Sequence, residues 1–185
     1  MTYDPPRPTG RLLLTPEDRD APERVGRLRS LGLGEYAEPV FDAFADRLAE
    51  VASVPYAMVN FIDENRQFFA GVHVPAEPTG EMAVLGADRY LARDHGFCPY
   101  VVVRRKALVL EDVREYPKFA GNPVVDDHRI RSYLGAPLID RTGIALGTIC
   151  VLDVKPRPWG RAGLETIKAM AAELAGQIEG REAFP

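Results

Sequence analysis

The sequence predicts one α/β (α+β) domain with a central, mostly antiparallel sheet of five to six strands and helices on both faces. The sheet is indicated by two pairs of apolar segments, each joined by a short polar turn as in a β-hairpin. The helices are indicated by long segments at both ends with apolar residues at three- and four-residue steps. A chain of 185 residues suits one domain with a real core and is short for two.

The N-terminal part is predicted to be an arm followed by two helices. Residues 1–21 combine prolines with scattered charges and show no sustained period, so we expect a flexible arm. A short helix is predicted for residues 22–31, because Gly32 and Gly34 would end it. Residues 38–53 form a strongly amphipathic pattern typical of a helix. Its apolar positions are Val40, Phe41, Phe44, Leu48, Val51 and Ala52.

The middle of the chain begins with the first hairpin, predicted from strands at 56–62 and 67–74. Residues 75–95 mix proline, glycine and charge, which indicates a long connection with at most one short helix. The pattern of residues 97–105 favours a helix, although the three consecutive valines at 101–103 would also fit a strand. The remaining predictions are a short strand at 107–110, a turn-rich stretch at 112–123 and a helical turn at 126–131.

The C-terminal part contains the second hairpin, with strands at 133–139 and 144–152 around the turn 140–143. A helix is predicted for 160–182, and the domain as a whole for 22–182, with a tail at 183–185. The helix carries an apolar seam made of Leu164, Ile167, Ala171, Leu174 and Ile178. The seam is too short for a coiled coil, so it either packs on the sheet or is shared with a second copy of the chain.

Composition narrows the functional classes. The formal net charge is −4, and the sequence lacks the concentration of basic residues that a nucleic-acid-binding surface needs. We therefore expect no nucleic-acid partner. The sequence contains no apolar run long enough to span a membrane, and its N-terminus does not resemble a secretory signal. We therefore expect a cytoplasmic protein. The two cysteines, Cys98 and Cys150, lie far apart and suggest free thiols rather than a disulfide or a zinc site.

Six stretches, in this order, carry a resemblance to a known family. They are Arg27–Leu33 with Pro39–Asp42, Val59–Phe68, Gly96–Val101, Asp112–Pro123, Ile130–Leu138 and Gly147–Asp153. Together they resemble GAF domains of bacterial signalling proteins over residues 24–180. The resemblance implies a regulatory role, with a small-molecule pocket or a dimer contact coupled to an output. No kinase, phosphatase, cyclase or DNA-binding pattern follows residue 180, so we expect the domain to signal through a partner, through self-association as a homodimer, or not at all.

Strand parity predicts where a pocket would lie. In the strand 56–62, Asn60 shares a face with apolar residues, and the opposite face is wholly apolar. The resemblance implies that the faces with Asn60 and Cys150 look toward the mid-chain helices, where GAF ligands bind. The candidate ligand-binding residues are Asn60, Phe97, Cys98, Tyr100, Ala136 and Cys150, with Asp112 and Arg131 as weaker candidates that could instead tie loops to the sheet. The alternative is that these polar groups are satisfied internally and no ligand binds.

Cysteine chemistry is the main alternative to a plain binding role. On a helix, His95 would share a face with Cys98 and could lower the pKa of its thiol, although a buried structural cysteine is the favoured interpretation. Free methionine-(R)-sulfoxide reductases are stand-alone GAF domains that use several cysteines, and this chain has two. The bilin-binding, cyclic-nucleotide and haem patterns of the family have no clear counterpart here. Adjacent residues such as Asp126, Asp127 and His128 rarely converge on one metal ion.

These observations predict a regulatory or sensory domain that binds a small molecule, a signalling partner, or both. The alternatives are a cysteine-dependent redox enzyme and a pure protein-interaction module without a ligand. We expect no catalytic residues and no metal ligands, and the sequence does not identify a cofactor.

Overall fold

The computed structural model describes residues 15–77 and 88–183. The strands are β1 (Tyr56–Ile62), β2 (Arg66–His73), β3 (Tyr90–Ala92), β4 (Leu108–Leu110), β5 (Ser132–Ile139) and β6 (Ala145–Asp153). The α-helices are α1 (Ala21–Ser30), α2 (Pro39–Ala52), α4 (Cys98–Arg104), α5 (Pro117–Ala120), α6 (Pro123–Asp127) and α7 (Gly160–Glu179). Two 3₁₀ turns, η2 (Val113–Glu115) and η3 (Gly180–Ala183), complete the described elements.

All strand pairs are antiparallel, and the six-stranded sheet has the order β3-β2-β1-β6-β5-β4. Both predicted hairpins are present, and they meet where β1 pairs with β6 in the centre of the sheet. Strand β3 was not predicted. It has only three residues at the sheet edge, too few to show a period of two in the sequence.

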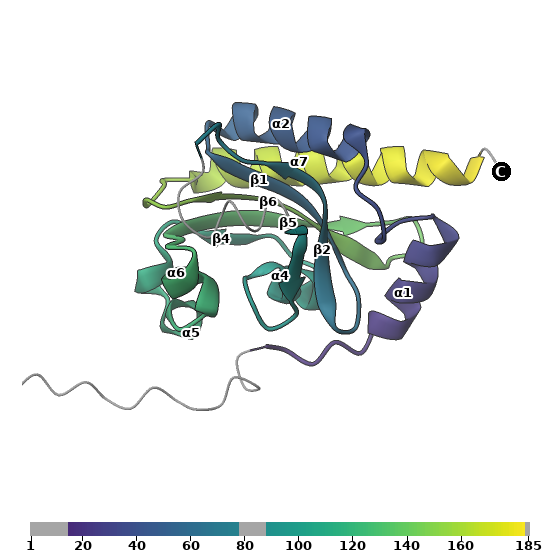
Figure 1. The fold of residues 1–185 in the computed structure, drawn as a ribbon, viewed down its shortest axis with the longest axis horizontal. Helices are drawn as coiled ribbons and strands as arrows, with labels where there is room; N and C mark the ends of the chain where they lie inside the picture. The colour runs from purple at the N-terminus through teal and green to yellow at the C-terminus, as the bar shows by residue number, and fades with distance from the viewer. Residues whose placement is uncertain (1–14, 78–87, 184–185) are drawn as a thin grey trace, which may run out of the picture.

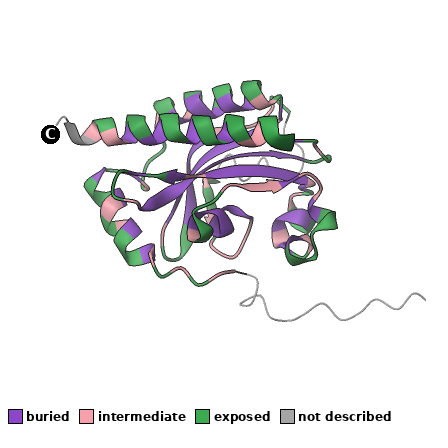
Figure 2. Ribbon diagram, turned by 180° about the vertical axis from the view of Figure 1, so that it is seen from behind, coloured by how far each residue is buried: buried purple, intermediate pink, exposed green. Residues whose placement is uncertain are grey.

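The helices cover both faces of the sheet, as predicted. Figure 1 shows α2 and α7 side by side on one face, with α4, α5 and α6 on the other and α1 beside one end. Each face has its own apolar cluster, and the cluster under α2 and α7 includes Ala57, Val59 and Phe61. The other cluster includes Met58 and Ile62 of the same strand, which confirms the predicted parity. Figure 2 shows the buried strands between helices whose outer faces are exposed.

The apolar seam of α7 packs on the sheet of its own chain. Ile167, Ala171, Leu174 and Ile178 are all buried in the cluster under this helix. Leu164, the fifth residue of the seam, is only half-buried, so the sheet of the same chain covers most of the seam but not all of it. No described helix combines the length and apolar character needed to cross a membrane.

The mid-chain helices α4, α5 and α6 each have a proline in the first turn, which fits their local geometry. Pro99 lies in the first turn of α4, where a missing N–H costs nothing, and the helix accommodates the valine triplet that left a strand open. Helix α6 begins earlier than the helical turn predicted at 126–131. Asn122 caps it by accepting a hydrogen bond from the backbone N–H of Val124, and Pro123 follows at the first helical position.

The predicted arm, residues 1–21, falls partly outside the described residues, which begin at 15. Asp18 and Arg24 form an ion pair in which both side chains are buried. Arg24 also donates from Nε to the backbone oxygen of Ala145, 2.6 Å away, at the start of β6. The segment just before α1 is therefore attached to the sheet. The predicted tail also lies partly outside, since residues 184 and 185 are not described.

Candidate functional site

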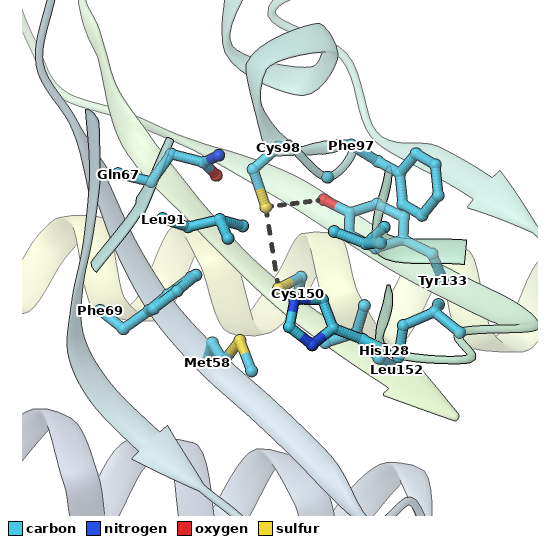
Figure 3. A pocket seen from close by; sticks show the side chains of 13 residues that line it. Met58, Gln67, Phe69, Leu91, Phe97, Cys98, His128, Tyr133, Cys150 and Leu152 are labelled. Carbon is cyan, nitrogen blue, oxygen red and sulfur yellow. Dashed lines mark hydrogen bonds between the residues drawn. The ribbon is translucent and has the colours of Figure 1, made fainter. Parts of the chain in front are cut away.

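A small cavity lies between the sheet and the mid-chain helices, with a volume of about 40 Å³. Its lining is mostly apolar and comes from β1, β2, β3, β5, β6, α4, α6 and the segments that flank these helices (Figure 3). The lining residues are Met58, Gln67, Phe69, Leu91, Gly96, Phe97, Cys98, Val124, His128, Ile130, Tyr133, Cys150 and Leu152. A volume of this size holds a few water molecules, whereas sites for drug-sized ligands measure about 300–1,000 Å³.

The loop before α4 is fixed by one buried amide. Asn122 accepts a hydrogen bond from the N–H of Gly96 and donates one to its backbone oxygen, each over 2.8 Å. This reciprocal pair joins the start of α6 to the start of α4. It holds Cys98, the first residue of α4, over the centre of the sheet.

The two thiols meet in this cavity. Cys98 Sγ lies 3.8 Å from Cys150 Sγ in β6 and 3.2 Å from Tyr133 Oη in β5, and all three residues are buried. Figure 3 shows the three groups converging from α4 and from two neighbouring strands. The sheet thus brings together two cysteines that are distant in the sequence.

Gly135 makes room for the Tyr133 ring. A Cβ at position 135 would lie 2.2 Å from Tyr133 Oη and 2.6 Å from its Cζ. Gly135 is also the β5 residue that pairs with Cys150. The phenol folds back over this position and thereby reaches Cys98, which a larger residue at 135 would prevent.

Two further polar side chains, Thr148 and Asn60, lie beside Cys98 and interact with its sulfur. The Thr148 hydroxyl and the Asn60 Oδ1 are buried and form no hydrogen bond of ordinary length and angle within the part of the chain that the structure describes. The Asn60 Nδ2 donates to Gln67 Oε1 over 2.9 Å, and the Gln67 Nε2 donates to the backbone oxygens of Ala92 and His95. This chain of amides links the centre of the sheet to the loop before α4.

The polar contacts make the two thiols unequal. The hydrogen bond with Cys150 is the main cause that lowers the pKa of Cys98 to about 6, although burial opposes this shift. Thr148, Tyr133 and Asn60 lower it further. The hydrogen bond with Cys98, together with burial, raises the pKa of Cys150 well above its ordinary value. Burial also raises the pKa of Tyr133, so its hydroxyl keeps its proton and can donate to a thiolate.

The predicted site residues separate into two groups. Phe97, Cys98 and Cys150 line the cavity, and Asn60 adjoins it through Gln67. Tyr100 lies on α4 but packs against Phe119, with ring centroids 4.9 Å apart, and is not among the lining residues.

The other three candidates lie elsewhere. Ala136 belongs to the cluster under α2 and α7, because it pairs with Ile149 and so has the opposite parity to Gly135. Asp112 and Arg131 form a bidentate ion pair over 2.6 and 3.1 Å that ties η2 to the start of β5. The Arg131 hydrogen bonds lower the pKa of Asp112. This placement fits the loop-tying alternative.

The predicted link between His95 and Cys98 does not hold in the structure. Helix α4 begins at Cys98, so His95 precedes it and the two residues do not share a helix face. The His95 Nδ1 instead lies 2.8 Å from Asp94 Oδ1. Among the described residues, no group of three or more His, Cys, Asp or Glu side chains is arranged to hold a metal ion.

Tyr133, Gly135 and Gln67 were not predicted as site residues. The signal for Tyr133 and Gly135 is the alternation along β5, which places both on the face of Cys150 in the neighbouring strand β6. Using that signal requires the register between the two strands, which the turn length alone does not define.

Replacing Tyr133 with phenylalanine is expected to raise the pKa of Cys98, because the thiolate loses one donor. A hydrogen bond to a charged group contributes about 1.5–3 kcal/mol, so the midpoint should rise by about one to two pH units. The measurement is an NMR titration of the protein labelled with ¹³C at cysteine Cβ. Because His128 also lines the cavity, the wild type and the variant are titrated under the same conditions, so that any contribution of His128 is common to both.

Gly135→Ala provides the matching test, because it displaces the hydroxyl without removing it. A rise similar to that in Tyr133→Phe would support the geometric role of Gly135. An unchanged Cys98 midpoint in both variants would show that Tyr133 does not stabilise the thiolate.

Comparisons with known proteins agree with this architecture. The family model of the GAF domain matches residues 37–178. A cyclic di-GMP phosphodiesterase of Pseudomonas aeruginosa is 32% identical over 145 residues, which are 77% of this chain. The chain spans 23% of the length of that relative.

Two solved structures are similar in fold. The GAF domain of an Acinetobacter phosphoenolpyruvate-protein phosphotransferase has a TM-score of 0.60 and 18% identity, covering 90% of this chain and 98% of that one. Type II free methionine-R-sulfoxide reductase from Thermoplasma acidophilum has a TM-score of 0.57 and 14% identity, covering 75% of this chain and 89% of that one. Likeness at these identities concerns the fold alone.

Proposed function

Because the chain belongs to the GAF domain family, a sensory and regulatory fold, we propose that it binds a small molecule in the cavity beside Cys98 and passes this state to a signalling partner. The observation that carries the proposal is the cavity itself. Its apolar lining contains two oriented polar groups, namely the Cys98 thiol and the Tyr133 hydroxyl. That combination is the usual form of a small-molecule site.

The size of the cavity restricts the ligand. A volume of about 40 Å³ admits a molecule of a few heavy atoms, unless the surrounding side chains move. We propose an uncharged or weakly polar molecule, because the cavity offers hydrogen-bonding groups within an apolar lining and a buried unpaired charge would be costly.

Native mass spectrometry tests the ligand proposal. The freshly purified chain, before and after incubation with a small-metabolite extract, is expected to carry a non-covalent adduct. The matched control is Leu91→Phe, which enlarges a half-buried lining residue on the edge strand β3 and should abolish the adduct. Bare protein in every wild-type sample, or an adduct that persists in Leu91→Phe, would contradict binding in this cavity.

We propose that the partner is a signalling enzyme or a second copy of the chain, in the cytoplasm. The curated relative, a cyclic di-GMP phosphodiesterase that is much longer than this chain, supports an enzymatic partner. Val40 and Val51 of α2 are each 52% exposed and offer apolar contact points for a partner. Sedimentation at several concentrations tests the dimer, and a monomer at the highest concentration would leave only the separate partner.

The distance between the thiols supports a second candidate, a cysteine-dependent reductase of free methionine sulfoxide. This substrate exceeds the 40 Å³ cavity, so we expect no turnover when the chain is incubated with methionine sulfoxide and dithiothreitol. Turnover that disappears in Cys98→Ser would replace the regulatory proposal with the enzymatic one.

A further inference from the structure

The pair of thiols in the cavity has a chemistry of its own, separate from ligand binding. Cys98 and Cys150 are the only cysteines in the chain, and the fold places their sulfurs 3.8 Å apart. We propose that they are a modification site for hydrogen peroxide, which oxidises them to an intramolecular disulfide.

The geometry requires a small movement. A disulfide bond measures about 2.05 Å, and the two sulfurs are now 3.8 Å apart. They must therefore move closer by roughly 1.8 Å to form the bond. Cys98 lies in the first turn of α4 and Cys150 lies in the central strand β6, and both residues are buried. Burial separates each thiol from other protein molecules, which favours the internal bond over a bond between chains.

The surroundings assign a different role to each cysteine. Tyr133 Oη lies 3.2 Å from Cys98 Sγ, and the buried Thr148 hydroxyl has no partner among the described residues. A thiolate at Cys98 would supply the missing acceptor for that hydroxyl. Because the thiolate is the nucleophile in thiol oxidation, Cys98 attacks the peroxide and Cys150 resolves the product.

The reaction proceeds in two balanced steps. The Cys98 thiolate attacks one peroxide oxygen and breaks the O–O bond, giving a sulfenic acid and hydroxide, which becomes water with the proton that Cys98 had lost. The Cys150 sulfur then attacks the Cys98 sulfur and displaces hydroxide, which becomes water with the Cys150 proton. In total, two thiols lose two electrons, and one hydrogen peroxide becomes two molecules of water. The Tyr133 hydroxyl keeps its proton and donates to the Cys98 sulfur.

The cavity also defines which oxidants can reach the site. Cys98 is 5% exposed, and the adjoining cavity of about 40 Å³ accommodates hydrogen peroxide, which is little larger than water. Cumene hydroperoxide carries an aromatic ring and does not fit. The folded chain is therefore expected to discriminate between the two oxidants by size.

Mass spectrometry after rapid alkylation in denaturant tests the proposal. One equivalent of hydrogen peroxide is expected to lower the mass by two hydrogen atoms and to protect both cysteines from alkylation, with reversal by dithiothreitol. Cumene hydroperoxide should react at least tenfold more slowly with the folded chain. This difference should disappear in denaturant.

Single variants test the two roles. In Cys150→Ser, dimedone is expected to trap a sulfenic acid at Cys98. In Cys98→Ser, hydrogen peroxide should oxidise the remaining thiol of Cys150 at least tenfold more slowly than it oxidises the wild-type pair. Circular dichroism checks that both variants remain folded. If either variant unfolds, the mass measurement on the wild-type chain still tests whether the internal disulfide forms.

Several outcomes would overturn the inference. They are two free thiols after excess peroxide, a disulfide between chains, oxidation of Cys98 beyond the sulfenic acid while Cys150 stays free, and trapping at Cys150 instead of Cys98. The inference does not depend on the proposed ligand. A failed oxidation test would leave ligand binding open, and a missing adduct would leave the dithiol open.

Discussion

Replacing Gly147 with alanine is expected to reduce the free energy of unfolding by about 3 kcal/mol. Gly147 lies in β6 opposite Phe61 of β1, at the centre of the sheet. A Cβ at this position would lie 1.9 Å from the backbone oxygen of Asn60 and 2.9 Å from Phe61 Cα. These are backbone atoms of a central strand, so the methyl group can be accommodated only if β1 and β6 separate.

Urea-induced unfolding measures this effect through the midpoint at constant slope. Gly176→Ala is the matched control, because a Cβ at this position in α7 meets no atom within 4 Å. Alanine there removes backbone freedom from the unfolded chain and should raise stability by about 0.5–1 kcal/mol. A Gly147→Ala variant as stable as wild type would contradict the close approach of β1 and β6.

Removing the Asp18 carboxylate is expected to cost about 3–5 kcal/mol, because it leaves a buried charge without its partner. The Arg24 guanidinium donates to Asp18 over 2.6 and 3.0 Å, and the two side chains are 1% and 5% exposed. In Asp18→Ala, the guanidinium would retain only its bond to the Ala145 backbone oxygen among the contacts described for it.

The double variant Asp18→Ala with Arg24→Met should recover much of the loss, since it removes the buried charge as well. Arg161→Ala is the control, because its pair with Glu165 is highly exposed and should contribute less than about 1 kcal/mol. Urea midpoints of the four proteins provide the comparison. Equal small losses in Asp18→Ala and Arg161→Ala would show that the segment before α1 is not attached to the sheet.

Much of the fold could be predicted because its signals are local. The hairpin around 63–65, the amphipathic helix α2 and the seam of α7 each repeat over many residues. Strand β3 escaped prediction because its pairing with β2 depends on backbone contacts rather than on a side-chain pattern. The start of α6 was misplaced because the asparagine and proline at its beginning resembled another turn.

The alternation of side chains along single strands predicted only part of the candidate site. Alternation within single strands showed which neighbours share a face with Asn60 and with Cys150, and the family resemblance implied that these faces look toward the mid-chain helices. Cys150 lies in the apolar cluster on that side of the sheet. Ala136 was named as a candidate without a face being assigned to it, and it lies in the cluster under α2 and α7, because it pairs with Ile149 rather than with Cys150. The contact between Tyr133 and Cys98 depends on how a phenol folds over Gly135, and no sequence spacing encodes that packing.

We expect the two thiols in the cavity to be unequal, with Cys98 losing its proton well before Cys150. An NMR titration of the protein labelled with ¹³C at cysteine Cβ measures both cysteines separately and needs no access by a reagent. We expect Cys98 to titrate at about pH 6 while Cys150 remains protonated well above its ordinary pKa of 9.0. If Cys98 instead titrates at 9.0 or higher, or loses its proton after Cys150, the account of this site is contradicted.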